Sequence, residues 1–208
     1  MERKILFATT NPYKKKRFQN YFKTLGLSVI SFSDIQDKVE VIEDGKTPKE
    51  NALKKATAGY NLTRIPTFGV DYWLSLEGFS EDTQPGPYVR RIFVGKDGKR
   101  VEANDEEMLK YYTEKIKALG GKTNGVWTST IALVVDVNHI YTKSFTRTTV
   151  FVSNQSPKRT EGEPLNSIQI DPVSGKYFTD LTPREWLNLE KGTERGYITF
   201  MKKHLQEI

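Results

Sequence analysis

Apolar and polar residues follow one another in blocks at the start of the chain, and these blocks predict regular structure. Residues 5–8 form a β-branched and aromatic run that predicts a buried strand, and residues 9–11 are small and polar, as in a turn. Pro12 suits the first position of a helix, where the missing N–H costs no hydrogen bond. Residues 27–32 predict a second strand, so the chain opens with a strand, a helix and a strand.

The later part of the chain shows the same two kinds of pattern. Thr47 and Glu50 have the spacing of a capping box, and Pro48 follows at the first helical position. The order of the elements predicts an α/β fold with a mixed, twisted sheet and flanking helices. The expected elements are a long loop over 33–46, a helix over 48–61, a strand over 65–71, a helix over 105–119, a β-hairpin of 126–136 and 140–152, and closing helices over 184–190 and 194–206.

Composition narrows the possible kinds of protein only slightly. The 208 residues, 37% of them hydrophobic, are enough for one globular unit with a sizeable core. The net charge of +6 suits a phosphate-bearing ligand but is also common in proteins that bind none. There is no cysteine, and the two histidines, His139 and His204, are far apart, so any metal is expected to have oxygen ligands. The sequence has no apolar run typical of a signal peptide or a membrane span, so we expect a cytoplasmic location.

A basic run, Lys14 to Arg17, occupies the first turns of the first predicted helix. Positive charge is unfavourable there because the helix dipole already favours anions at the N-terminus. Two interpretations are open at this point. The run is either a solvated basic face or part of a binding site for a polyphosphate.

Three segments of the sequence resemble motifs of one known family. Residues 9–14 (TTNPYK) resemble its T-x-N-x-x-K loop, residues 43–56 its E-x-G-x-T-x-x-E-N-A-x-x-K-A segment, and residues 85–91 its P-G-x-Y segment. Fainter similarity appears at residues 168–172 and 190–196. This is the inosine triphosphate pyrophosphatase family, also called the Ham1 or RdgB family. The resemblance implies an elongated two-lobed fold with a central cleft, so residues 1–208 are expected to form a single domain of two lobes.

Asp71 is the leading catalytic candidate. It follows an apolar run and is expected at the end of a strand, where open α/β folds place ligands, although it could equally cap that strand. In an extended chain Glu77 projects to the same side. The resemblance places Asp71 at the second acid of a D-D-S-G-L-like motif and implies that it activates water or positions a metal, with Glu77 in reserve. This chain has Val70 at the first acid and Tyr72 and Trp73 at the small pair.

The resemblance also implies a metal site and a phosphate site. Glu43 matches a metal-associated glutamate, and with Asp71 it would hold Mg²⁺, or Mn²⁺ in its place; Asp44 could share this role. Magnesium is usually held by one or two carboxylates together with substrate phosphates, which fits so small a set. The residues expected to bind the substrate at its phosphate end are Thr9, Asn11, Lys14, Lys54 and Arg90.

The motifs that would recognise the base are less well preserved. Asp171, Lys191 and Arg195 match family positions and are expected to bind the substrate. An aromatic pair and a histidine are, however, replaced by Ile168, Ile170 and Glu194. We therefore expect an altered or relaxed base preference.

The resemblance implies hydrolysis of non-standard purine nucleoside triphosphates (ITP, dITP, XTP) to the monophosphate and pyrophosphate. We also expect a homodimer and no nucleic-acid partner. One alternative is the sibling inosine/xanthosine triphosphatase family, which releases orthophosphate and whose motifs are similar to residues 8–12 and 71–78. A second alternative is a non-catalytic nucleotide- or nucleic-acid-binding protein, favoured by the positive charge and by the three Trp, ten Tyr and eleven Phe residues.

Overall fold

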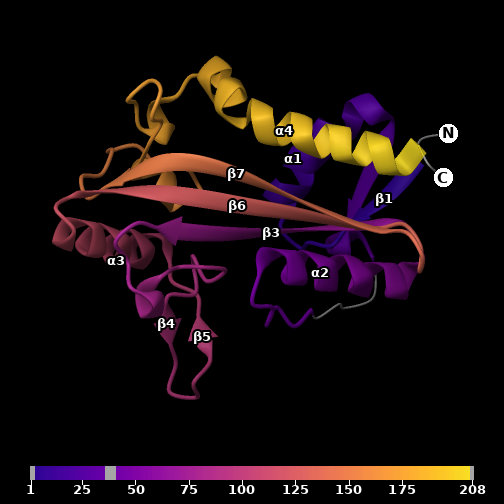
Figure 1. Ribbon diagram of the computed structural model, residues 1–208, viewed down its shortest axis with the longest axis horizontal. Coiled ribbons are helices and arrows are strands. Elements are labelled where there is room, and N and C mark those ends of the chain that lie inside the picture. The colour runs from indigo at the N-terminus through magenta and orange to yellow at the C-terminus, as the bar shows by residue number, and fades with distance from the viewer. Residues whose placement is uncertain (1–2, 36–40, 207–208) are drawn as a thin grey trace. The chain divides into compact units, whose positions relative to one another are not determined.

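The central structure of the protein is a mixed β-sheet. The computed structural model describes residues 3–35 and 41–206, and within them the strands form a six-stranded sheet, ordered β2-β1-β3-β6-β7-β8, and a two-stranded sheet of β4 and β5 (Figure 1). Strand β1 pairs in parallel with β2 and β3, whereas β7 and β8 are antiparallel. The prediction of an α/β fold with a mixed sheet and flanking helices is confirmed.

The elements follow the sequence patterns closely at most positions. The helices are α1 (Pro12–Phe22), α2 (Pro48–Thr63), α3 (Asp105–Ala118) and α4 (Pro183–Gln206). The strands are β1 (Arg3–Phe7), β2 (Leu27–Ser31), β3 (Thr67–Leu76), β4 (Phe93–Val94), β5 (Arg100–Val101), β6 (Lys122–Val134), β7 (Ile140–Val152) and β8 (Gln169–Ile170).

The chain divides into two compact units, each built from separate segments. The first unit contains Met1–Tyr72, Thr128–Phe145 and Gly192–Ile208, and the second contains Trp73–Trp127 and Thr146–Lys191. Strands β3, β6 and β7 and helix α4 therefore contribute residues to both units.

The core of the first unit lies on both faces of its strands. On β1, Ile5 and Phe7 pack with aromatic residues of α1 and with the C-terminal part of α4, while Leu6 faces the other way and packs with Phe32. Figure 1 shows α2 on the sheet face opposite α1 and this part of α4. Helix α2 comes so close to β3 that a Cβ atom on Gly69 would lie 2.3 Å from the carbonyl oxygen of Ala52. Glycine at this position allows the helix and the strand to pack together.

The second unit has its own core around α3. Leu74 and Leu76 at the end of β3 pack with Leu109 and Tyr112 of α3, all of them buried. The buried Tyr112 hydroxyl donates a hydrogen bond to the carbonyl oxygen of Val89 at 2.9 Å. This bond satisfies the hydroxyl and ties the segment before β4 to the helix.

Two predicted boundaries are wrong. Strand β3 continues to Leu76, so Asp71 lies in the middle of a ten-residue strand rather than at its end. Two helices were predicted where the structure has the single helix α4. The helix continues through Gly192 because one glycine costs a helix only about 1 kcal/mol. A Cβ atom on Gly196 would lie 2.2 Å from the ring of Phe145, so close packing holds the helix in place across this region.

Two further predictions concern segments outside regular structure. A short 3₁₀ turn, Phe32–Asp34, overlaps the start of the predicted loop over 33–46, and residues 36–40 of that loop lie outside the described residues. None of the helices in the described part of the chain has the length and apolar character needed to cross a membrane.

Candidate active site

The loop between β1 and α1 is shaped by its own side chains. The Asn11 side chain accepts hydrogen bonds from the backbone N–H groups of Tyr13 and Lys14 at 2.9 and 3.0 Å, and so caps α1. The Thr9 hydroxyl accepts from the N–H of Asn11 at 3.2 Å. These bonds satisfy N–H groups that the first turn leaves without helical partners. Thr9 and Asn11 thereby fix the start of the helix that carries Lys14.

Lys14 carries a positive charge in a poorly solvated position. Its ammonium nitrogen lies 5.1 Å from the ring centroid of Tyr72, within the range of a cation–π contact. Burial lowers the pKa of Lys14, and the charge of Lys55 lowers it further, while Asp71 and Glu43 oppose both effects. Lys14 is therefore electrostatically coupled to both carboxylates and to the second lysine, and an added anion would stabilise its charged form.

Asp71 is the centre of this group of charges. It is buried in β3, and its Oδ1 lies 2.6 Å from the Lys55 ammonium. The side-chain N–H of Asn51 donates to its Oδ2 at 3.4 Å. Burial raises the pKa of Asp71 above that of an ordinary aspartate, although the positive charge of Lys55 partly offsets the effect. The carboxylate is thus a stronger base than a solvent-exposed aspartate.

Glu43 reaches the same lysine from the loop before α2. Its Oε2 lies 3.1 Å from the Lys55 ammonium, so one cation contacts both carboxylates. The loop is docked onto α2 by the buried Asn51, whose Oδ1 accepts the N–H of Gly45 at 2.8 Å. A Cβ atom on Gly45 would lie 2.4 Å from that oxygen, so a larger residue would push the loop away from the helix. Asn51 therefore connects the loop of Glu43 to Asp71.

The predicted capping box before α2 forms only in part. The Thr47 hydroxyl accepts from the N–H of Glu50 at 3.2 Å, as expected. The Glu50 carboxylate accepts instead from the N–H of Lys46, at 2.8 Å. The start of α2 is capped all the same, because both bonds satisfy N–H groups of the loop and the first turn.

The donor set would fit a magnesium ion whose remaining ligands are phosphate oxygens. Glu43 and Asp71 offer hard carboxylate oxygens that already converge on one positive group. In the described ranges 3–35 and 41–206, no cluster of three or more His, Cys, Asp or Glu side chains could hold a metal by itself. Two carboxylates completed by phosphate oxygens are a usual arrangement for magnesium.

The structure places Lys55, rather than Lys54, beside Asp71. Lys54 is exposed and pairs with the exposed Asp44. The two lysines are neighbours in sequence but point in directions about 100° apart on a helix. Two signals identify Lys55: it lies one turn after Asn51 on the same face, and it stands at the lysine position of the E-x-G-x-T-x-x-E-N-A-x-x-K-A pattern. The sequence reasoning missed both signals.

Four other predicted site residues belong to the second unit, namely Glu77, Arg90, Asp171 and Lys191. Glu77 accepts a hydrogen bond from the Asn124 side chain at 2.7 Å. Arg90 donates to Asp105 at 2.7 Å and to the carbonyl oxygen of Gly162 at 3.2 Å. Glu77, Arg90 and Asp171 thus belong to the second unit, whereas the group of charges around Asp71 belongs to the first.

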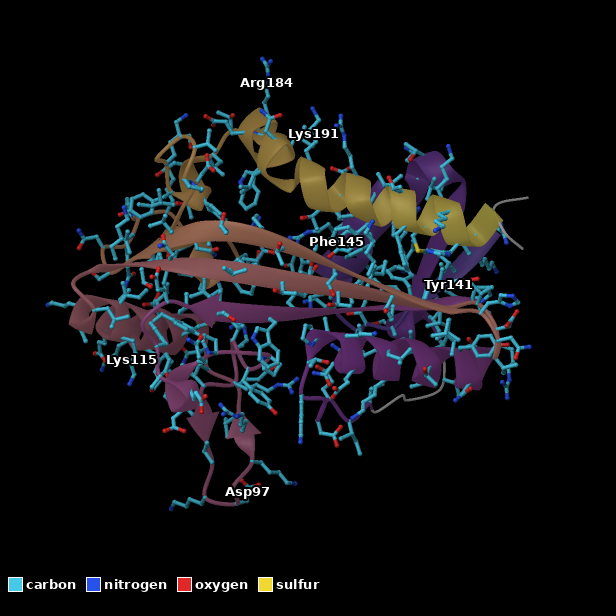
Figure 2. All side chains as sticks on the ribbon, viewed as in Figure 1. Asp97, Lys115, Tyr141, Phe145, Arg184 and Lys191 are labelled. Atoms are coloured by element: carbon cyan, nitrogen blue, oxygen red, sulfur yellow. The ribbon has the colours of Figure 1, made fainter. Side chains whose placement is uncertain are left out.

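The residues predicted at the base end have structural contacts of their own. Burial alone would raise the pKa of Asp171, but hydrogen bonds from the Ser174 hydroxyl and N–H, at 2.6 and 2.9 Å, hold that pKa below its usual value. Ile168 is fully buried in the core of the second unit. Lys191 is exposed and extends outward from α4 (Figure 2), and Arg195 is exposed further along the same helix.

The sequence and the fold of this chain are similar to those of known proteins. The sequence profile of the Ham1 family matches residues 5–160. The chain belongs to the Ham1 family. A protein of Geobacter sulfurreducens named dITP/XTP pyrophosphatase is 35% identical over 106 residues, 51% of either chain. A protein of the same name from Clostridium tetani is 32% identical over 139 residues, 65% of either chain. The chain thus spans about half to two thirds of the length of these curated relatives.

Solved structures extend the likeness to the fold of nearly the whole chain. A HAM1 protein from Coxiella burnetii superposes with a TM-score of 0.78, at 20% sequence identity, over 97% of this chain and 99% of that one. The Ham1 protein of Staphylococcus aureus gives a TM-score of 0.75 at 18% identity, with the same coverage. At these identities the comparison establishes a common fold.

Proposed function

We propose that this protein hydrolyses non-standard purine nucleoside triphosphates (ITP, dITP, XTP) between the α and β phosphates, releasing the monophosphate and pyrophosphate. The observation that carries the proposal is the buried Asp71, which forms an ion pair with Lys55 and interacts electrostatically with Lys14. The family and the names of its curated relatives support the same activity.

Each residue of the group around Asp71 would have its own role in the hydrolysis. Asp71 accepts a proton from the attacking water and so acts as the general base. Lys14 and Lys55 contact phosphate oxygens and stabilise the charge that develops on the departing pyrophosphate. Thr9 and Asn11 hold the start of α1 so that Lys14 is placed for this contact.

Glu43 and Asp71 would hold a magnesium ion, or a manganese ion in its place. When bound, such an ion supplies Lewis-acid stabilisation of negative charge on the phosphates. The protein's own contribution is to fix the two carboxylates, through Asn51 and the docked loop at Gly45. Full activity in excess chelator would contradict this part of the proposal.

The base end is proposed to use Asp171, Lys191 and Arg195. Ile168 is buried in a hydrophobic core, and the Asp171 carboxylate accepts hydrogen bonds from its own turn. A buried isoleucine has no aromatic ring and no exposed surface for stacking on a base, which supports the altered base preference expected from the sequence. Glu77 and Arg90 stay predictions of lower priority, because each has a partner within the second unit.

A triphosphate panel tests the proposed function. Purified protein is incubated with Mg²⁺ and ITP, XTP, dITP, GTP or ATP, and pyrophosphate and orthophosphate are measured separately. Pyrophosphate release from ITP, dITP or XTP supports the proposal, whereas release of orthophosphate would favour the sibling triphosphatase activity. The homodimer and the cytoplasmic location stay predictions, to be tested by light scattering and by microscopy of a tagged chain.

A further inference from the structure

A single ammonium group contacts both carboxylates of the candidate metal site. Lys55 lies 2.6 Å from Asp71 and 3.1 Å from Glu43, and only 11% of its side chain is exposed. The Asp71 side chain is 9% exposed and that of Glu43 is 31% exposed. Water therefore screens this ion-paired group less than it screens pairs on the surface.

The charges of the group already balance without a metal. Lys14 and Lys55 oppose Glu43 and Asp71, and the lysines are close enough for Lys55 to lower the pKa of Lys14. The ammonium groups of Lys14 and Lys55 would repel a free divalent cation. It would also compete with Lys55 for the same carboxylate oxygens. A polyphosphate removes both the repulsion and the competition, because its oxygens attract the two lysines away from the carboxylates.

We propose that Lys55 is an internal counter-ion that keeps the two carboxylates from binding free divalent metal, so that the metal enters together with the triphosphate. On entry, the Lys55 ammonium exchanges its carboxylate partners for phosphate oxygens, and no covalent bond changes. The identity of the triphosphate rests on the proposed function. The weak binding of free metal does not, because it follows from the group of charges itself.

Lys54 offers a matched control on the same helix. It is adjacent in sequence, carries the same charge and forms an ion pair with Asp44. Its side chain is 44% exposed and its partner 68% exposed, so this pair is far better solvated than that of Lys55. Removing the Lys54 charge changes the net charge of the protein by the same amount and frees only the exposed Asp44, while Glu43 and Asp71 keep Lys55.

The experiment measures Mn²⁺ binding without nucleotide, by electron paramagnetic resonance of the free ion and by calorimetry. The wild type is compared with Lys55→Gln, Lys55→Arg and Lys54→Gln. Lys55→Gln is expected to bind Mn²⁺ at least tenfold more tightly than the wild type, while the other two variants bind it as weakly as the wild type. Equal affinity of Lys55→Gln and the wild type, or an equal gain in Lys54→Gln, would overturn the inference.

Folding is followed in the same samples by circular dichroism and thermal unfolding. Mn²⁺ is expected to raise the unfolding temperature of Lys55→Gln more than that of the wild type, because a ligand of the folded state stabilises it more, at the same concentration, the lower its Kd. If Lys55→Gln is unfolded in chelator, recovery of its folded spectrum on adding Mn²⁺ supports the inference and failure to recover contradicts it. A gain in metal affinity in Lys55→Gln, together with a wild type that hydrolyses none of the triphosphates, would uphold this inference and refute the proposed function.

Discussion

Replacing Asp71 by Asn separates the catalytic role of this residue from its structural role. The two side chains have nearly the same shape, so the change removes charge and basicity while β3 keeps its packing. General-base catalysis contributes about 100- to 10,000-fold, or about 2.7 to 5.5 kcal/mol of activation free energy. We expect the Asp71→Asn substitution to lower the turnover of the best triphosphate by a factor within this range.

The stability of Asp71→Asn follows from the direction of the pKa shift. Burial raises the pKa of Asp71 in the folded state, so its ionisation opposes folding. The wild type therefore loses stability as the pH rises from the ordinary aspartate pKa, about 3.9, through the raised pKa of the folded state. Asn has no such ionisation. We expect the variant to be as stable as the wild type near neutral pH, or more stable, and to lose this relative advantage at acid pH.

The assays for this prediction are pyrophosphate release and urea unfolding at pH 7 and pH 4. Asp180→Asn is the matched control, because Asp180 also pairs with a lysine, Lys158 at 2.7 Å, but lies in the second unit. This control should retain turnover. Near-normal turnover in Asp71→Asn would refute the catalytic role. A variant that is much less stable than the wild type at pH 7 but matches it at pH 4 would refute the linkage argument.

Three further predictions address the phosphate end, the fold and the base end. Lys14→Ala and Lys55→Ala should weaken binding of a triphosphate more than binding of the monophosphate, and added salt should reduce the difference; equal weakening of both ligands in calorimetry would contradict the assignment. Gly69→Ala should destabilise the protein by about 1 to 3 kcal/mol in urea unfolding, because its Cβ would meet the backbone of α2. Discrimination between ITP and ATP should be roughly tenfold or more below that of relatives with the aromatic pair, since each lost contact is worth about 1 to 3 kcal/mol; a preference for ITP by several orders of magnitude would show that other residues rebuild the base pocket.

Local signals were sufficient to predict most of the helices and strands. Pro12, Pro48 and the glycines at 120 and 121 mark helix ends through chemistry that acts within one or two turns, and the structure has its helices there. The end of β3 was misplaced because a charged residue after an apolar run is typical of a strand terminus. The compensating charge at Asp71 comes from Lys55 on α2, and a tertiary contact of this kind is invisible to a local pattern.

The candidate site was predictable in part for the same reason. Lys14, Glu43 and Asp71 were identified from motifs, and the structure brings them into one electrostatic group. The choice of Lys55 over Lys54 was available from the sequence, because Lys55 stands at the lysine position of the motif, and the close packing of Gly69 against Ala52 shows which face of α2 meets β3. The positioning role of Asn51 also needed coordinates, because its two partners come from a loop and from a strand on either side of it in the sequence.

The first unit is made of three separate segments of the chain, so the group around Asp71 cannot simply be expressed as a short fragment. Residues 1–72 contain every member of the group around Asp71, so a short expression fragment is an obvious design for spectroscopy. That fragment would lack β6, the neighbour of β3, and would present β3 as an open edge able to pair with other copies of itself. Solution studies of these charges therefore call for isotopic labels placed in the whole 208-residue chain.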